Sequence, residues 1–349
     1  MDTQKKTPKD AGYIMPAEWH PHNAVWISWP HNKETLGNVL TRVESVYVEI
    51  VDALHNSERV NLLVNDKSSQ DKIDRKLSSN NISLKNISFY IIKTGDLWIR
   101  DYGPNFILNE SKSSLAMNNW IFNAWGNKYE NILIDNSVPE KINKYLSLPI
   151  FNPGIVLEGG SIDVNGKGTC ITTEQCLLNK NRNPALSRTQ IEEYLNSYLG
   201  VSNIIWLKEG IIGDDTDGHI DDIARFVSHD TVVCSFEENT NDENYHNLKK
   251  NYEVLSRAKL ENGNPLRIIK LPMPNPILYE NKRLPASYSN FYIGNNAVLV
   301  PVFNQDKDNI AMNILKELFP NRKIVGINCT ELVIGLGAIH CITQQEPYT

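Results

Sequence analysis

The chain has 349 residues, of which 41% are hydrophobic, and its 35 Lys plus Arg against 41 Asp plus Glu give a formal net charge of −6. This length supports two ordinary domains or one large closed architecture. The acidic balance and the lack of a dense basic stripe argue against a nucleic-acid partner. No segment approaches the roughly 18 consecutive apolar residues of a membrane span, so we expect no membrane partner.

The N-terminal sequence and the cysteines indicate a reducing compartment. The first twelve residues, MDTQKKTPKDAG, have no apolar run behind their lysines, which argues against a secretory signal or a transit peptide. The number of cysteines is odd, and no Cys-x-x-Cys pair occurs. They are Cys170, Cys176, Cys234, Cys329 and Cys341. We therefore expect a cytoplasmic protein without a structural zinc ribbon.

Helical and strand patterns alternate along the chain. In chain order, residues 41–56 (TRVESVYVEIVDALHN) predict a helix, and residues 60–64 (VNLLV) predict a strand. Four later runs follow turns and are typical of the second strand of a β-hairpin; they are residues 113–117, 168–172, 230–234 and 296–300. Two further stretches predict helices; they are residues 187–199, with Ser187 as N-cap, and residues 309–319, with Asn309 as N-cap.

This alternation leaves two architectures open. The hairpin runs recur about every 60 residues, and no linker rich in Gly, Pro or Ser divides the chain. Four or five small sheet-plus-helix units set around an axis would cover their strand edges. An ordinary α/β sheet in two domains is the alternative.

The first segment that could carry chemistry runs from Asp96 to Pro104, DLWIRDYGP. It lacks the alternation of a core strand and ends in a Gly-Pro turn. Trp98, with Asp96 and Asp101, offers an apolar wall beside two acids, where charge and the aromatic face could hold a cation. An ion pair between Arg100 and a neighbouring aspartate accounts for the same residues without a ligand.

A second segment places an acid beside glycines. Residues 157–161, LEGGS, put Glu158 immediately before two glycines, which allow a ligand to approach the backbone closely. A bulge with a surface glutamate is the more ordinary interpretation.

The most acidic segment, residues 213–222 (GDDTDGHIDD), surrounds His219 with aspartates. A calcium loop is excluded, because with Gly218 at its sixth position the first and twelfth positions are not acidic. No second histidine lies nearby to complete a catalytic metal site. His219 and Asp221 are two residues apart, so in an extended segment both side chains leave one face, as a proton carrier beside a carboxylate would. A solvated acidic turn is the alternative.

The last segment, residues 335–347 (GLGAIHCITQQEP), contains Cys341. Glycines and amides place this cysteine on a polar turn, where a thiolate could be stabilised and reached. Cys170 and Cys234, by contrast, lie in β-like runs and are typical of inert core residues.

A cysteine, a histidine and several carboxylates together suit a planar cationic substrate. Carboxylates match the fork of a guanidinium through paired, charge-assisted hydrogen bonds. A thiolate is a strong enough nucleophile to attack the central guanidinium carbon.

With these motifs the chain resembles the agmatine deiminases, which are similar to the bacterial peptidylarginine deiminases of the guanidine-modifying superfamily. Seven segments carry the resemblance, in order, over nearly the whole chain: MPAEWHPHNAVWISWPHN (15–32), DLWIRDYGP (96–104), FNAWGNKY (122–129), LEGGSIDVNGKGT (157–169), GDDTDGHIDDIARFV (213–227), LPASYSNFYIGNNAVLVP (284–301) and IHCITQQEP (339–347). The resemblance implies one catalytic domain over residues 1–349. It also implies an α/β fold of five ββαβ-like blades around a pseudo-fivefold axis, a five-bladed α/β propeller or pentein.

The resemblance also implies roles for individual residues. Cys341 would be the nucleophile and His219 the general acid and base. Asp101 and Asp221 would clamp the guanidinium, and Glu158 would complete the polar wall. The predicted substrate contacts are Trp98, Asp96, Asp214, Asp215, Asp217 and Asn290. No metal and no other cofactor is implied.

The implied reaction is the hydrolysis of agmatine to N-carbamoylputrescine and ammonia through a covalent thiouronium, in putrescine (polyamine) biosynthesis or agmatine catabolism. Agmatine ends in an ammonium that the acids of residues 213–222 attract, whereas the carboxylate of arginine needs a cation. A peptidylarginine or arginine deiminase and a catalytically silent binding scaffold are the alternatives. The resemblance further implies a homo-oligomer, a dimer or larger.

Two departures from the family pattern concern loops near the site. The cysteine turn usually contains three consecutive glycines, whereas here Leu336 and Ala338 interrupt the run. Asn127 stands where a second glycine is usual, and asparagine tolerates a left-handed backbone. These changes bear on the mobility of the loop and leave the nucleophile in place.

Overall fold

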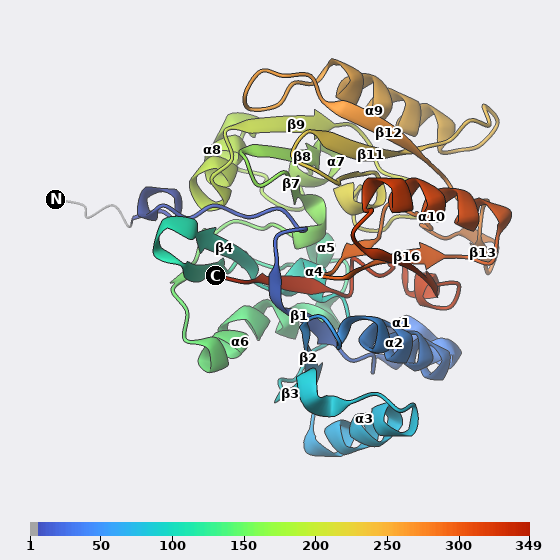
Figure 1. Ribbon diagram of the computed structural model, residues 1–349. Helices are drawn as coiled ribbons and strands as arrows, with labels where there is room; N and C mark the ends of the chain where they lie inside the picture. The colour runs from blue at the N-terminus through green and yellow to red at the C-terminus, as the bar shows by residue number, and fades with distance from the viewer. Residues whose placement is uncertain (1–5) are drawn as a thin grey trace.

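The structure, a computed structural model, describes residues 6–349 and has the expected mixed α/β character (Figure 1). The predicted domain, 1–349, also includes residues 1–5, which lie outside the described residues. The strands of residues 6–349 form five separate sheets of three or four strands and one two-stranded hairpin. These separate small sheets differ from the single α/β sheet per domain that the alternative of an ordinary two-domain α/β protein requires.

The four-stranded sheet has the order β18-β1-β2-β3 and contains β1 (His22–Ser28), β2 (Arg59–Val64), β3 (Ile87–Ile91) and β18 (Gln344–Pro347). The three-stranded sheets contain β4 (Asn105–Asn109), β5 (Ser114–Asn118) and β6 (Ile150–Phe151); β7 (Asp163–Val164), β8 (Thr169–Thr173) and β9 (Asn203–Leu207); β10 (Ala224–Phe226), β11 (Thr231–Phe236) and β12 (Arg267–Pro272); and β15 (Tyr292–Ile293), β16 (Ala297–Val302) and β17 (Lys323–Asn328). The hairpin consists of β13 (Leu278–Tyr279) and β14 (Lys282–Arg283).

The helices are α1 (Lys33–Leu36), α2 (Leu40–Leu54), α3 (Lys67–Ser79), α4 (Ile99–Tyr102), α5 (Ala124–Asn127), α6 (Val138–Leu146), α7 (Glu174–Leu177), α8 (Arg188–Leu199), α9 (Tyr245–Arg257) and α10 (Asp306–Leu318). The 3₁₀ segments are η1 (Lys9–Ala11), η2 (Gly37–Val39), η3 (Leu84–Asn86), η4 (Glu110–Lys112), η5 (Glu130–Ser137), η6 (Gly159–Ser161), η7 (Ile220–Asp222) and η8 (Leu332–Gly335). Within the part of the chain that the structure describes, none of the helices has both the length and the apolar character needed to cross a membrane.

Each three-stranded sheet repeats one pattern. Its first two strands pair antiparallel, as β10 and β11 do, and its last two pair parallel, as β11 and β12 do. A helix such as α9 joins the parallel pair, because parallel neighbours need a crossover connection. The four predicted hairpin runs are confirmed: β5, β8, β11 and β16 are each the second strand of an antiparallel pair.

The five sheets lie around the short helices α4 and α5. In Figure 1 the sheet of β1–β3 lies at the bottom, β4 at the left, the strands β7–β9 and β11–β12 at the top, and β16 at the right. Among these, β8 is buried over all of its residues. The sequences of the central strands are accordingly nearly continuous apolar or β-branched runs, without the alternation of a strand that exposes one face to solvent.

The predicted helices are largely confirmed. The helix predicted at residues 41–56 is α2, which ends two residues earlier, at Leu54. The helix predicted at residues 187–199 is α8, where Ser187 is the N-cap in a capping box with Gln190. The predicted N-cap Asn309 is wrong, because α10 begins at Asp306 after the N-cap Gln305. The Asp308 carboxylate accepts from the backbone N–H of Gln305 at 2.9 Å, which stabilises the earlier start.

Pairing of the two chain ends places the cysteine turn in the interior. Strand β18 runs antiparallel to β1, with Gln344 opposite Trp26. Just before β18, the backbone N–H of Arg100 donates to the Cys341 carbonyl at 3.1 Å, and the Arg100 Nε donates to the His340 carbonyl at 3.2 Å. These bonds join the cysteine turn to α4, the helix that carries Asp101.

Candidate active site

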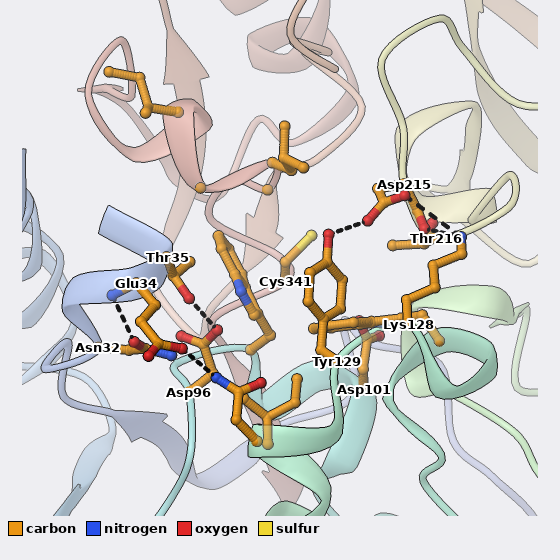
Figure 2. Close-up of a pocket in the computed structure, with 18 of the residues that line it drawn as sticks. Asn32, Glu34, Thr35, Asp96, Asp101, Lys128, Tyr129, Asp215, Thr216 and Cys341 are labelled. Carbon is orange, nitrogen blue, oxygen red and sulfur yellow. Dashed lines mark hydrogen bonds and ion pairs between the residues drawn. The ribbon is translucent and has the colours of Figure 1, made fainter. Parts of the chain in front are cut away.

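A cavity of about 580 Å³ lies between α1, the Asp96–Asp101 segment, η5, the loop after η8 and residues 215–216 (Figure 2). In Figure 2 the Cys341 sulfur lies between Tyr129, Lys128 and Asp215 on one side and Asp96, Thr35 and Glu34 on the other. We call the buried residues Asp101, Glu158, His219, Asp221 and Cys341 the floor of the site. Asp101 and Cys341 line the cavity itself, and the other three lie behind them, within 3.9 Å of one another or of these two. We call the more exposed lining residues Lys128, Tyr129, Asp215 and Leu336 the mouth.

The sulfur of Cys341 reaches the cavity from the turn before β18. It accepts a hydrogen bond from Asn290 Nδ2 at 3.1 Å and donates to Asp221 Oδ2 at 3.7 Å. Burial raises the pKa of the Cys341 thiol well above its ordinary value, and the carboxylates of Asp221, Asp222 and Asp101 add to the shift. The free site therefore holds a neutral thiol.

Asp101, His219 and Asp221 converge on one glycine. A Cβ added to Gly160 would lie 2.6 Å from His219 Nδ1, 2.7 Å from Asp101 Oδ1 and 3.2 Å from Asp221 Oδ2, so only glycine leaves room for the three side chains. His219 caps η7 and Asp221 lies within it, so the segment is a 3₁₀ turn. The segment is therefore not extended, and the two side chains are instead brought to the same side of Gly160 by the turn.

The Asp101 carboxylate is held in place from three sides. Oδ1 accepts from the Gly160 N–H at 3.0 Å and lies 3.6 Å from His219 Nδ1, while Oδ2 accepts from Trp125 Nε1 at 2.9 Å. Burial raises the pKa of Asp101 to about 6; His219 opposes the shift, and the carboxylates of Asp221 and Glu158 add to it.

Glu158 is fully buried beneath His219, which overturns the interpretation as a surface glutamate in a bulge. Its Oε1 accepts from Arg182 Nε at 2.7 Å, and its Oε2 lies 3.9 Å from both His219 Nε2 and Cys176 Sγ. Burial alone would raise the pKa of Glu158, but Arg182 and then His219 hold it below its ordinary value. Glu158 is therefore a permanent anion under the imidazole.

The protonation of His219 follows from these neighbours. Burial favours the neutral ring, but the carboxylate of Asp101, with contributions from Cys176 and Glu158, raises the pKa of His219 well above its ordinary value. Among residues 6–349, neither ring nitrogen has a hydrogen-bond partner of good geometry. The ring is thus a buried imidazolium whose N–H groups are free to act on a bound molecule.

Asp221 is oriented by the residue that precedes the cysteine. Its Oδ2 accepts from His340 Nδ1 at 2.7 Å, and His340 Nε2 donates to Glu18 Oε2 at 2.8 Å. Glu18 also accepts from Arg225 Nη2 at 2.7 Å. Burial would raise the pKa of Asp221, but His340 and then His219 hold it below its ordinary value. The Asp221 Oδ1 has no hydrogen-bond partner in the described chain.

Four residues of this network were missed from the sequence. Glu18 and Trp125 lie in the quoted segments MPAEW and FNAW, and His340 adjoins the cysteine, but no chemical role was assigned to them. Arg182 lies in the run NKNRNP, which carries no motif. Only the knowledge that Glu158 is buried would have called for a paired cation there.

The predicted substrate contacts divide into two groups. Trp98, Asp96 and Asp215 line the cavity. Asp96 accepts from Thr35 Oγ1 at 2.6 Å, and burial raises its pKa to about 6 against that hydrogen bond. Asp215 accepts from the Tyr129 hydroxyl.

The other predicted contacts do not line the cavity. Asp214 accepts from the backbone N–H groups of Thr216 and Gly218, at 2.7 and 2.8 Å, and thereby shapes its own loop. Asp217 pairs with Arg182 at 2.6 Å and Lys128 at 3.0 Å. Asn290 is fully buried against the cysteine turn.

One group of donor atoms in the described residues has metal-ligand character. It consists of the Glu158 carboxylate, the Cys176 sulfur and a His219 nitrogen, which lie within 4.8 Å of one another. Arg182 already pairs with Glu158 at 2.7 Å. The group shares two residues with the floor and belongs to the same site.

The fold and the site together define a mixed α/β protein with a buried cysteine, histidine and carboxylate centre. Residues 14–347 match the family described as Porphyromonas-type peptidyl-arginine deiminase, and the chain belongs to this family. The resemblance found in the sequence is thereby confirmed.

Named relatives span the whole chain. An agmatine deiminase of Medicago truncatula is 37% identical over 375 residues, covering 98% of this chain and 98% of that protein. An agmatine deiminase of Stutzerimonas stutzeri is 35% identical over 370 residues, covering 99% of each. The solved agmatine deiminase of Enterococcus faecalis is 33% identical, covers 99% of this chain and 98% of that chain, and has a TM-score of 0.91.

Proposed function

We propose that this protein is an agmatine deiminase, which hydrolyses agmatine to N-carbamoylputrescine and ammonia. One observation carries the proposal: Cys341 and Asp101 line the same cavity, and Asp221, whose Oδ1 has no partner among the described residues, lies directly against the Cys341 sulfur at 3.7 Å. A guanidinium offers donors to such oxygens and an electrophilic carbon to the sulfur. The full-length relatives named agmatine deiminases support the same substrate.

Substrate binding would prepare the nucleophile. In the free site burial, and then the nearby carboxylates of Asp221, Asp222 and Asp101, raise the pKa of the Cys341 thiol and keep it protonated. A guanidinium placed between Asp101 and Asp221 neutralises them and brings a positive charge next to the sulfur, which favours the thiolate. The thiol proton leaves to solvent, and the thiolate then faces the guanidinium carbon.

The first half-reaction releases ammonia. The sulfur attacks the guanidinium carbon, a C–S bond forms, and the C=N electron pair moves to nitrogen to give a neutral tetrahedral adduct. His219, present as the imidazolium, gives its proton to one amino group. The C–N bond breaks, ammonia departs, and a thiouronium cation remains on Cys341. His219 is then neutral and can act as a base.

The second half-reaction uses water. His219 accepts a proton from water as the oxygen adds to the thiouronium carbon, which restores the imidazolium. The C–S bond then breaks with its electron pair on sulfur, the resulting thiolate takes up the hydroxyl proton, and the ureido product forms. Glu158 stabilises the imidazolium in both halves, because it remains an anion under the ring.

Lining residues in the mouth and next to it would select the other end of the substrate. Agmatine ends in an ammonium, and the lining carboxylates Asp96 and Asp215, with the face of Trp98, suit a cation. The carboxylate of arginine would meet these acids unfavourably. Among the described residues that line the cavity, Lys128 is the only Lys or Arg, and it already lies within 3.5 Å of Asp215 and Asp217.

We also propose the finer points of the assignment. The five sheets, with their repeated antiparallel and parallel pairs, would be the blades of a five-bladed α/β propeller in a single catalytic domain. The protein would act in the cytoplasm as a homo-oligomer, in putrescine synthesis or agmatine catabolism. These points rest on the family and on the repeated topology.

The test measures ammonia and ureido-product release from agmatine, arginine and a blocked peptidylarginine, in parallel with Cys341→Ala. We expect turnover of agmatine alone, abolished in the variant. Activity on the blocked peptide would move the assignment to a peptidylarginine deiminase. Inactivity on all three substrates would favour a binding scaffold.

A further inference from the structure

Asn290 lies just before β15 and contacts the proposed nucleophile rather than the cavity. Its side chain is fully buried, and its Nδ2 lies 3.1 Å from Cys341 Sγ. It is absent from the cavity lining. The predicted contact of Asn290 with substrate stays a prediction, whereas its position beside the sulfur points to a role at the nucleophile.

Three neighbours fix the orientation of the Asn290 amide. Its Oδ1 accepts from the backbone N–H of His340 at 2.9 Å and of Cys341 at 3.4 Å. Both neighbours are donors, so the oxygen must face them, and the NH₂ group must face the sulfur. The Nδ2 also donates to Asp222 Oδ1 at 3.0 Å. The donor at the sulfur is thus set by the network and not by an arbitrary amide assignment.

The surroundings of the sulfur make such a donor valuable. The acids that face Cys341 are Asp101, Asp221 and Asp222. The hydroxyl of Tyr47 is also nearby, and burial and then the charges of Asp96 and Cys341 raise its pKa. Of these acids, Asp221 only accepts a hydrogen bond from the thiol. A thiolate here needs N–H groups that stabilise its charge, and Asn290 supplies one at 3.1 Å from the sulfur.

We propose that Asn290 is a further catalytic residue, whose Nδ2–H stabilises the Cys341 thiolate both before attack and when the C–S bond breaks. This inference rests on Cys341 being the nucleophile of the proposed function. The hydrogen bond is present in the free site, and it strengthens whenever the sulfur carries negative charge, because hydrogen bonds to ions are stronger than those between neutral groups. Asn290 thereby plays for the sulfur the part that an oxyanion hole plays for oxygen.

The direct test measures how fast neutral iodoacetamide alkylates Cys341 as a function of pH, read by peptide mass. Asn290→Ala and Asn290→Asp are compared with the unmodified protein. We expect the apparent pKa of Cys341 to rise by about 1 unit in Asn290→Ala and by more in Asn290→Asp, which sets an acceptor against the sulfur. At pH 7, kcat/KM for agmatine should fall about 10- to 100-fold, with KM nearly unchanged.

A matched control separates this role from a loss of folding. Asn251 is also fully buried, accepts from the Lys208 N–H at 2.8 Å and donates to the Glu209 carbonyl at 2.8 Å, but it lies outside the site. Asn251→Asp should lower stability and leave the alkylation profile of Cys341 unchanged. If Asn290→Ala gives the same alkylation profile as the unmodified protein while kcat/KM falls, Asn290 is merely structural and the proposal is wrong.

A second measurement needs no change at Asn290. In protein labelled with ¹⁵N-asparagine, one side-chain amide signal should shift at the pH where Cys341 titrates, and the shift should vanish in Cys341→Ala. If no asparagine amide follows the thiol, the proposed hydrogen bond is refuted. Neither the alkylation nor the amide signal depends on agmatine turnover, so failure of the proposed function would be recognised separately.

Discussion

The floor and the mouth of the cavity are built on different principles. On the floor, Glu158 is paired with Arg182, and Asp221 with His340, at 2.7 Å each, and all four side chains are nearly free of solvent. At the mouth, the ion pair of Lys128 and Asp215 spans 3.5 Å, and both side chains are more than a quarter exposed.

This difference indicates which part of the reaction, the chemical step or the choice of substrate, each region controls. Buried, paired groups hold one geometry and keep their charges strong, whereas exposed pairs are screened by water and contribute little. Changes on the floor should therefore affect the chemical step, and changes at the mouth should affect substrate choice. The following variants test that division.

The largest effect is expected for Asp101→Asn. The amide cannot match the guanidinium charge, and its NH₂ group would face an N–H donor of either Gly160 or Trp125. Steady-state measurement of the ureido product should show kcat/KM lowered by about 10³. Asp135→Asn is the control, since Asp135 is equally buried but accepts from the backbone of Gly95 and Asp96. Comparable losses in both variants would contradict a special role for Asp101.

Gly160→Ala should disturb the floor without removing a charge. The added methyl group would lie 2.6 Å from His219 Nδ1 and 2.7 Å from Asp101 Oδ1, so both side chains must shift. A misplacement of this size should lower kcat by about 10². Gly154→Ala is the control. Its φ of +80° also makes a side chain unfavourable, but an added Cβ would have no atom within 4 Å to displace. That variant should lose some stability and keep its kcat.

The floor was the part of the site best predicted from the sequence. The segments around Asp101, Glu158, His219 and Cys341 are short runs of polar residues and glycine that break the surrounding apolar patterns. Such runs can be recognised because they interrupt the pattern of apolar residues that the buried strands and helices require. The repeated hairpins were predicted for the same reason, since turn and β-branched signals are local.

The partners of the floor and the layout of the mouth could not be predicted in this way. Arg182 meets Glu158 across 24 positions in sequence, and Glu18 meets His340 across 322. Asp214, Asp215 and Asp217 look equivalent in the sequence, yet only Asp215 lines the cavity. Which way each carboxylate points depends on a turn that includes Asp217 at a φ of +67° and Gly218 at +88°, and no periodicity encodes it.

Binding of agmatine to Cys341→Ser should depend on pH. The raised pKa of Asp101, about 6, means that this carboxyl becomes neutral as the pH falls below 6 and then attracts a guanidinium less. Calorimetry should show affinity lowered about tenfold between pH 7 and pH 5, since one pH unit below the pKa leaves about a tenth of the carboxylate ionised. A binding constant that stays flat over this range would contradict the clamp.

The stability of the ligand-free protein should fall as the pH rises, whereas the affinity for agmatine should increase. A carboxyl whose folded pKa is raised contributes stability that is fully present below its unfolded pKa and is lost as the pH rises through its folded value. The pKa values of Asp96 and Asp101, about 6, and of Asp135, about 7, place this loss between about pH 4 and pH 7. The melting temperature of the free protein should therefore fall by a few degrees from pH 5 to pH 8, and Asp101→Asn should flatten the trend.

At the mouth, Asp215→Asn and Lys128→Met should have small and opposite effects. Loss of the Asp215 charge removes an attraction for the substrate ammonium, whereas loss of Lys128 frees Asp215 from its ion pair. KM for agmatine should rise about fivefold in the first variant and fall in the second, with kcat little changed, as expected for a partly exposed pair. Equal changes in kcat and kcat/KM would place Asp215 with the floor instead.

The smallest effect is expected for Leu336→Gly. Leu336 lines the mouth with a left-handed backbone, φ 71°, which a side chain adopts at a cost of about 1–2 kcal/mol. Glycine removes this strain but adds about 0.5–1 kcal/mol of chain entropy, so the melting temperature should rise by about 1–2 °C at most. The widened mouth should strengthen competitive inhibition by a blocked peptidylarginine more than it changes KM for agmatine. Ala338→Gly tests the reasoning in the same loop, because Ala338 is buried and has no positive φ; it should only destabilise. If both variants lose stability alike, the left-handed turn is not strained, and the leucine stabilises the loop by packing.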